Sequence, residues 1–162
     1  MKYTETYQRT RDIDWFFQAG DKSIHVASNA GKLPDFVNDI QRLREEQAKV
    51  SMLNDVIGVQ IIINTRFVDS IVAASVENLQ KSGYNNISVE YIRNSYLASF
   101  IEMARKGFYS YDRYPNNEST YVLVCGPDKP VSVGMKLLEM SNEIELSNEE
   151  SFFLVKTKFD EE

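Results

Sequence analysis

The sequence predicts an α+β fold in a single domain, residues 1–162, with a largely antiparallel β-sheet and about three α-helices packed on one of its faces. Apolar and polar residues alternate in segments 12–28 and 108–125, which is the pattern of strands that bury one face. Between these segments, apolar residues recur at the spacing of amphipathic helices. The strands near the two ends of the chain are therefore expected to meet in one sheet.

Segment 12–28 is expected to form a β-hairpin. Gly20 and Asp21 are suited to the tight turn, because such turns need residues that accept a positive φ. The cross-strand pairs on the apolar face would then be Phe17 with Ile24, Trp15 with Val26, and Ile13 with Ser28. A shift of one residue would expose this face, so the register is well specified.

The periodicity of apolar and polar residues predicts the remaining helices and strands in the first two thirds of the chain. Residues 3–9 are polar and alternate, which predicts a strand at a sheet edge. Apolar stripes predict helices over 34–50, 66–82 and 87–106. The last helix should end at Gly107, because glycine readily takes the left-handed conformation of a helix cap.

The C-terminal third is predicted to return to β-structure. Segment 108–125 forms a second hairpin around a polar loop, and residues 151–159 alternate as a C-terminal strand. Residues 160–162 are expected to be a frayed tail. For segments 51–65 and 131–146 the pattern leaves helix and strand open.

Composition restricts the class of partner and the compartment. A formal net charge of -6 and an isoelectric point near 4.9 disfavour direct binding to nucleic acid or to anionic membranes, and leave a basic protein partner open. The single cysteine, Cys125, has no internal disulfide partner, and the N-terminal segment is polar. These features favour the cytoplasm and no membrane span, while the oligomeric state stays open.

The chain lacks the common catalytic and cofactor motifs. Because His25 is the only histidine, zinc sites with two or more histidines are impossible. There is no phosphate-binding loop, no dinucleotide-binding glycine pattern and no nucleophile elbow. We therefore expect neither a metal nor a cofactor.

The first candidate site combines His25 with Asp14. In the predicted hairpin His25 is opposite Phe16 and diagonal to Asp14, and a carboxylate beside an imidazole can orient a general base. Cys125, at the end of an apolar strand, is a possible nucleophile for such a base. This hypothesis describes a small hydrolase or acyl-transfer enzyme. The competing interpretation is a packed histidine and a buried, inert thiol.

The second candidate site is the aromatic strand, residues 108–114. Tyr109, Tyr111 and Arg113 share one face of this strand, and tyrosine and arginine are enriched in protein-binding hot spots. A second packed layer over these residues is the alternative. The sequence favours a non-catalytic interaction or regulatory module that binds a protein through this face.

The acidic C-terminal third offers another surface for such a module. Its stretch from Glu139 to Glu150 contains Glu139, Glu143, Glu145, Glu149 and Glu150. They would suit a basic partner, although a solvated acidic face has the same composition. A small-ligand sensor with a pocket between sheet and helices is a further alternative.

Overall fold

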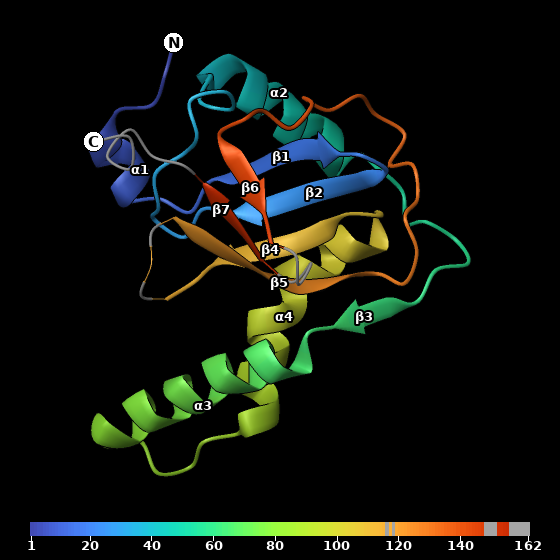
Figure 1. The fold of residues 1–162 in the computed structure, drawn as a ribbon. Coiled ribbons are helices and arrows are strands. Elements are labelled where there is room, and N and C mark those ends of the chain that lie inside the picture. The colour runs from blue at the N-terminus through green and yellow to red at the C-terminus, as the bar shows by residue number, and fades with distance from the viewer. Residues whose placement is uncertain (116, 118, 148–151, 156–162) are drawn as a thin grey trace.

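A seven-stranded β-sheet forms the centre of the computed structural model, which describes residues 1–115, 117, 119–147 and 152–155 (Figure 1). Six strands lie in the order β1-β2-β4-β5-β7-β6, and β3 pairs with β5 beside this path. The strands are β1 (Asp14–Ala19), β2 (Lys22–Ala27), β3 (Ile61–Ile63), β4 (Tyr109–Arg113), β5 (Thr120–Pro127), β6 (Ile144–Leu146) and β7 (Phe152–Val155).

The pairing of these strands confirms the α+β class and the largely antiparallel sheet. Among the pairs of named strands only β2 and β4 are parallel, with Ile24 beside Tyr109 and Val26 beside Tyr111, and one isolated parallel bridge joins Gln18 to Glu139. This pair joins the N-terminal hairpin to the second hairpin. Strands from the two ends of the chain therefore share one sheet, as predicted.

The N-terminal hairpin has the predicted register. Phe17 pairs with Ile24 and Trp15 with Val26, and Gly20 in the turn has a φ of 61°. All four of these paired side chains are buried in one apolar cluster. The turn residues and the apolar alternation therefore specify the same register. Each aromatic cross-strand pair stabilises it by roughly 0.2 to 1 kcal/mol relative to a pair of alanines.

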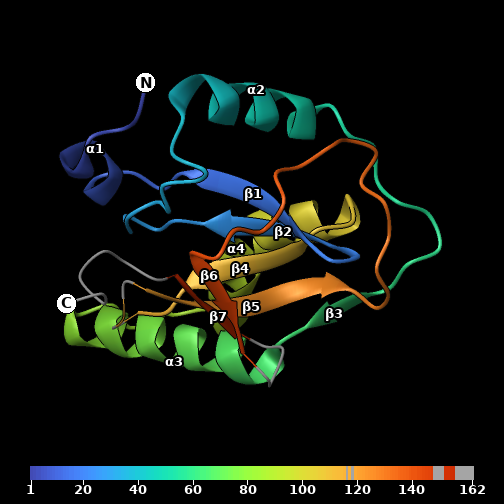
Figure 2. The ribbon, with the colours of Figure 1, turned by 45° about the horizontal axis from the view of Figure 1, so that its top comes forward.

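The helices are α1 (Glu5–Arg9), α2 (Ile40–Ser51), α3 (Thr65–Lys81) and α4 (Val89–Arg105). The bounds of α3 and α4 agree with the predicted helices 66–82 and 87–106. The helices do not all share one sheet face, however. α4 packs on β4 and β5 with α3 beside it, whereas α2 lies along β1 at the other end of the sheet (Figures 1 and 2).

Near the N-terminus one prediction is wrong, and another is correct except for the start of a helix. Residues 3–9 do not form a strand, because Thr4 caps a short helix by accepting a hydrogen bond from the Tyr7 N–H and Glu5 pairs with Arg9 one turn later. The helix predicted over 34–50 begins only at Ile40. Its N-cap is Asp39, and the residues before it form a turn.

The C-terminal predictions agree where residues are described. β4 and β5 form the second hairpin, with an irregular register between Ser110 and Tyr111. β7 lies within the predicted strand 151–159, whose remaining residues, like the tail 160–162, lie outside the described residues. The open segments 51–65 and 131–146 contribute the short strands β3 and β6, besides the last residue of α2 and the start of α3.

Lys106 joins the end of α4 to the end of α2. It is buried, and its Nζ donates hydrogen bonds to the carbonyl oxygens of Val50 and Leu53, both at 2.9 Å. Carbonyls at a helix C-terminus lack helical donors and carry partial negative charge. The ammonium group therefore satisfies these carbonyls and fixes α2 relative to α4.

α3 and the N-terminal half of α4 project from the body as a helical arm (Figures 1 and 2). Its outer part carries the exposed side chains of Tyr84, Val89 and Tyr91. Within the described residues, no helix is both long and apolar enough to cross a membrane.

Candidate functional site

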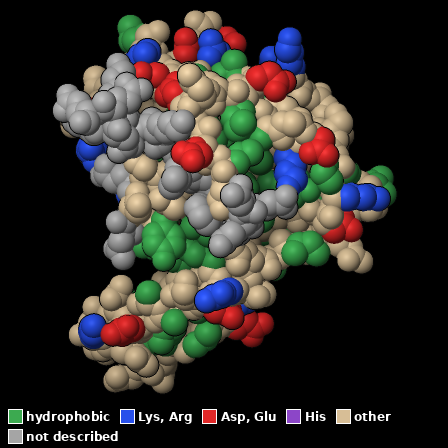
Figure 3. All heavy atoms as spheres, viewed as in Figure 1, with side chains coloured by type: hydrophobic (Ala, Val, Ile, Leu, Met, Phe, Trp, Pro, Cys, Tyr) green, Lys and Arg blue, Asp and Glu red, His purple; other side chains and the backbone are tan. Residues whose placement is uncertain are grey.

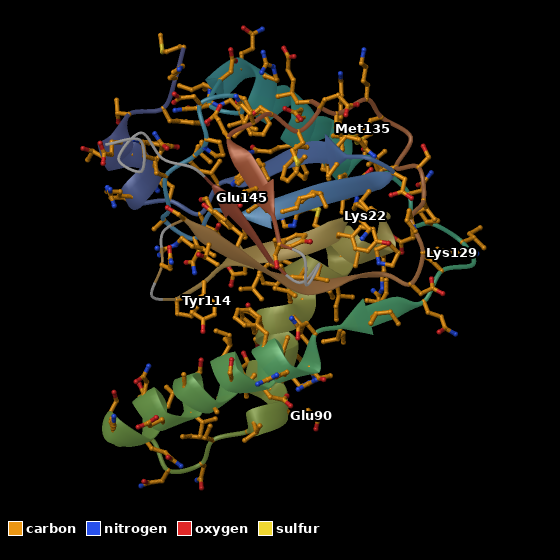
Figure 4. All side chains as sticks on the ribbon, in the orientation of Figure 1. Lys22, Glu90, Tyr114, Lys129, Met135 and Glu145 are labelled. Atoms are coloured by element: carbon orange, nitrogen blue, oxygen red, sulfur yellow. The ribbon has the colours of Figure 1, made fainter. Side chains whose placement is uncertain are left out.

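A groove of about 440 Å³ lies where four strands of the sheet meet the loop after β5. Its lining residues are Lys22, Ile62, Ile63, Asn64, Tyr109, Tyr111, Leu123, Gly126, Pro127, Asp128 and Pro130. Figure 3 shows hydrophobic side chains on the surface of this face, and Figure 4, in the same orientation, shows Lys22 among its strands. Apolar lining with a few polar groups is typical of binding sites.

Tyr109 is held across the groove by close packing. A Cβ atom on Gly126 would lie 2.5 Å from Cδ1 of the Tyr109 ring, so only glycine permits this approach. Nζ of Lys22 lies 5.3 Å from the centre of the same ring, within the range of a cation–π interaction. Burial and the nearby carboxylates of Asp21 and Asp128 raise the pKa of Tyr109. The ring is therefore a fixed, neutral part of the groove.

β3 gives the groove an exposed apolar border. One edge of β3 pairs with β5, with Ile62 opposite Gly126, and no described strand pairs with the other edge. The side chain of Ile62 is 56% exposed although it is aliphatic. A sheet edge with unpaired backbone groups can accept a further strand from another chain.

Arg113 lies away from the groove. Its Nε donates a hydrogen bond to the carbonyl oxygen of Asn29 at 3.0 Å, and its side chain passes directly over Gly31. Asn29 and Ala30 have positive φ values of 45° and 62°. Arg113 therefore holds a strained turn, whereas the other predicted binding residues, Tyr109 and Tyr111, both line the groove.

The structure also brings Asp14 and His25 together, with a third residue that the sequence did not indicate. Nε2 of His25 lies 2.8 Å from Oδ1 of Asp14, and Nδ1 lies 2.6 Å from Oγ of Ser110. For a neutral imidazole, Nε2 donates to the carboxylate and Nδ1 accepts from the serine hydroxyl. These are the contacts of an acid–base–nucleophile chain.

In this hydrogen-bonded series the serine is buried and the acid is partly exposed, which is the reverse of a catalytic triad. Ser110 is 0% exposed and His25 is 2% exposed, while Asp14 reaches solvent. The rings of Phe16 and Phe100 pack on the imidazole, with centroid distances of 5.5 and 6.4 Å. The hydroxyl is thus enclosed, and a substrate carbonyl has no room beside it.

Cys125 is also enclosed. It pairs with Ser110 in the β4–β5 register and is fully buried. Burial raises the pKa of the Cys125 thiol to about 12, so the reactive thiolate is disfavoured at neutral pH.

A buried acid, Asp112, lies in the same layer between sheet and helix. Oδ2 of Asp112 accepts a hydrogen bond from the Tyr96 hydroxyl at 2.8 Å, and Oδ1 accepts one from the Arg113 N–H at 2.8 Å. Burial raises the pKa of Asp112 to about 6 despite these donors. The layer is thus polar but internally hydrogen-bonded, which fits a role in specifying the packing of α4.

The acidic C-terminal third is partly used inside the fold. The Glu143 carboxylate accepts hydrogen bonds from the N–H groups of Asp35 and Phe36, at 2.8 and 2.9 Å. Glu145 is exposed on β6 (Figure 4), and residues 149–150 lie outside the described residues. Glu143 therefore anchors the turn before α2.

Comparison with known proteins adds no relative to this description. No family model matches the chain, and neither curated proteins nor solved structures gave a match. Across the described residues, no group of three or more His, Cys, Asp or Glu side chains is placed to hold a metal ion.

Proposed function

We propose that this protein is a non-catalytic interaction module that binds an extended segment of a partner protein in the groove between β2, β3, β4 and β5. The observation that carries the proposal is the convergence of Tyr109, Tyr111 and the exposed Ile62 on one groove of about 440 Å³. An extended segment could lie along the groove on the face of the sheet and place its side chains against Tyr109 and Ile62.

The chemistry of the groove suits a mostly apolar segment. Aromatic side chains already held in place lose little conformational freedom on binding, which is why tyrosine is frequent in binding hot spots. Lys22 and Asp128 lie among the lining residues and can orient the segment through one charge of each sign. The acidic composition of the chain supports a protein partner over nucleic acid.

The enzymatic alternative is less well supported by the structure. The Asp14–His25–Ser110 chain has suitable distances, but its hydroxyl is enclosed on the sheet side of α4. A satisfied, buried polar chain stabilises one packing arrangement and rejects others. We assign it that structural role. The single buried cysteine also suits the reducing cytoplasm as the working compartment.

The test is a pair of substitutions on exposed isoleucines. Ile62→Glu places a charge in the groove on a side chain that is 56% exposed, so the fold should be retained. Ile57→Glu is the matched control, because Ile57 is 96% exposed and is not a lining residue of the groove. Each tagged protein is incubated with lysate of its own cells, and bound proteins are quantified.

A partner that binds the wild type and Ile57→Glu but is lost with Ile62→Glu supports the proposal. A partner retained equally by both variants would show that another surface is used. Circular dichroism of both variants checks that the fold is intact.

A further inference from the structure

The apolar stripe of α4 is longer than the part of the helix that the sheet covers. Phe100 and Ala104, in its C-terminal half, are buried in the cluster between α3, α4 and the sheet. Toward the N-terminus the stripe continues through Tyr96, Ile92 and Val89, because steps of three or four residues stay on one side of a helix. Ile92 is half-buried, but Val89 is 54% exposed. The stripe therefore extends into the projecting arm, and its last residue reaches solvent (Figures 1 and 2).

The outer end of the arm also presents two tyrosines from a fixed backbone. The N–H of Tyr84 donates to the carbonyl oxygen of Leu79 at 3.1 Å, and Gly83 between them has a φ of 90°, as in a Schellman cap. The N–H of Tyr91, in the first turn of α4, donates to Oγ of Ser88 at 3.2 Å. The two tyrosines are 61% and 73% exposed. Exposed aromatic side chains on a fixed backbone are well suited to binding a protein.

The arm differs from the rest of the chain in its charge. Residues 65–97 contain three cationic and three anionic side chains, so the formal net charge of -6 comes entirely from the other residues. Inside the arm, Lys81 pairs with Glu77 at 3.0 Å, and Arg93 pairs with Asp69. Two copies of this acidic chain would repel each other over most of their surface. Between two arms, this repulsion is absent.

We propose that two copies of this chain associate through the outer ends of their helical arms, with Val89 and Tyr84 of each copy in the interface. Figure 4 shows Glu90, the neighbour of Val89, at this end of the arm. A two-fold axis places the same apolar surface of each copy against the other, and the two helix pairs then form one four-helix cluster. A basic partner would find no net negative charge on the arm, whereas a second copy is matched in both charge and apolar surface.

This interface is independent of the proposed binding groove. No lining residue of the groove lies within residues 65–97. A dimer formed through the arms therefore leaves both grooves open, and each copy can bind its own partner segment.

Sedimentation of the purified protein measures the association. Between about 1 µM and about 500 µM, the wild type should change from monomer to dimer by mass action. Val89→Glu should raise the dimer Kd about tenfold or more, because both copies place a carboxylate in an apolar interface. Val89 is the first residue of α4, where the helix dipole favours an acidic side chain, so the fold should be retained.

Asn94→Glu is the charge-matched control. Asn94 is exposed on the same helix, and five residues of α-helix place it on nearly the opposite side from Val89. This variant should keep the dimer Kd of the wild type. Tyr84→Ser is a second variant at the interface and should also weaken the dimer, and circular dichroism checks the fold of each variant.

A wild type that stays monomeric over this concentration range would overturn the proposal. So would equal dimer Kd values for Val89→Glu and Asn94→Glu, or a dimer that Ile62→Glu disrupts and Val89→Glu does not. A monomeric wild type that loses a protein from the cell lysate only with Val89→Glu would show that the arm binds a different partner, which also refutes association of two copies. The groove is tested separately, through the partner that Ile62→Glu fails to retain.

Discussion

Replacing Glu46 by glutamine should stabilise the protein at pH 8 and leave its stability unchanged near pH 4. The carboxyl has an ordinary pKa of 4.5 when exposed and about 7 in the fold. The folded state therefore binds the proton more tightly, and its stability is lost as pH rises from about 4.5 through about 7. At about 1.4 kcal/mol per pKa unit, ionised Glu46 costs up to about 3 kcal/mol above pH 7. Glutamine avoids that cost.

Urea unfolding at pH 4, 6 and 8 measures this effect. The difference in free energy of unfolding between Glu46→Gln and the wild type should be near zero at pH 4 and grow to about 2 to 3 kcal/mol at pH 8. Glu45→Gln should show no such trend, because Glu45 is exposed on the same helix. If Glu46→Gln is less stable than the wild type at pH 8, the carboxylate is ionised and paired there, and the reasoning fails.

Three further predictions concern residues whose contacts are specific. Lys106→Met should lower the free energy of unfolding by about 2 to 3 kcal/mol, because two carbonyls at the end of α2 lose a charged donor. Ser110→Ala should cost about 1 to 3 kcal/mol, because Nδ1 of His25 loses its buried partner. Gly126→Ala should shift the Tyr109 ring, lower the melting temperature and weaken partner binding at the groove.

Matched controls make these results interpretable. Arg105→Met and Ser99→Ala alter exposed side chains of α4 and should each change stability by less than about 0.5 kcal/mol. An equal loss in Lys106→Met and Arg105→Met would show that the cap on α2 contributes nothing. For Gly126→Ala, unchanged ring resonances of Tyr109 in NMR spectra would contradict the close packing of this ring on Gly126.

Local patterns explain why much of the fold could be predicted. The register of the first hairpin depends on Gly20 and on the alternation of a few residues on either side of it. The local sequence is therefore sufficient to predict this register. α3 and α4 are long enough that their apolar stripes distinguish a helix from a strand. For residues 3–9, the Thr4 cap and the Glu5–Arg9 spacing were helical signals that the polar alternation concealed.

The parts that sequence could not predict depend on contacts between distant segments. Ser110 meets His25 because β2 and β4 pair in parallel, and nothing in either strand specifies that neighbour. Lys106 and α2 are likewise far apart in sequence. Among the binding candidates, Tyr109 and Tyr111 were correctly placed on one face, but the groove exists only because β3 joins β5 beside them.

The most direct test of the account is amide hydrogen exchange on the protein with and without the partner that Ile62→Glu fails to retain. Slower exchange in the complex is expected at residues 61–63 and 109–111, because the partner covers Ile62 and Tyr109 in the groove. Unchanged exchange at these strands, with new protection confined to residues 84–91 of the helical arm, would contradict it.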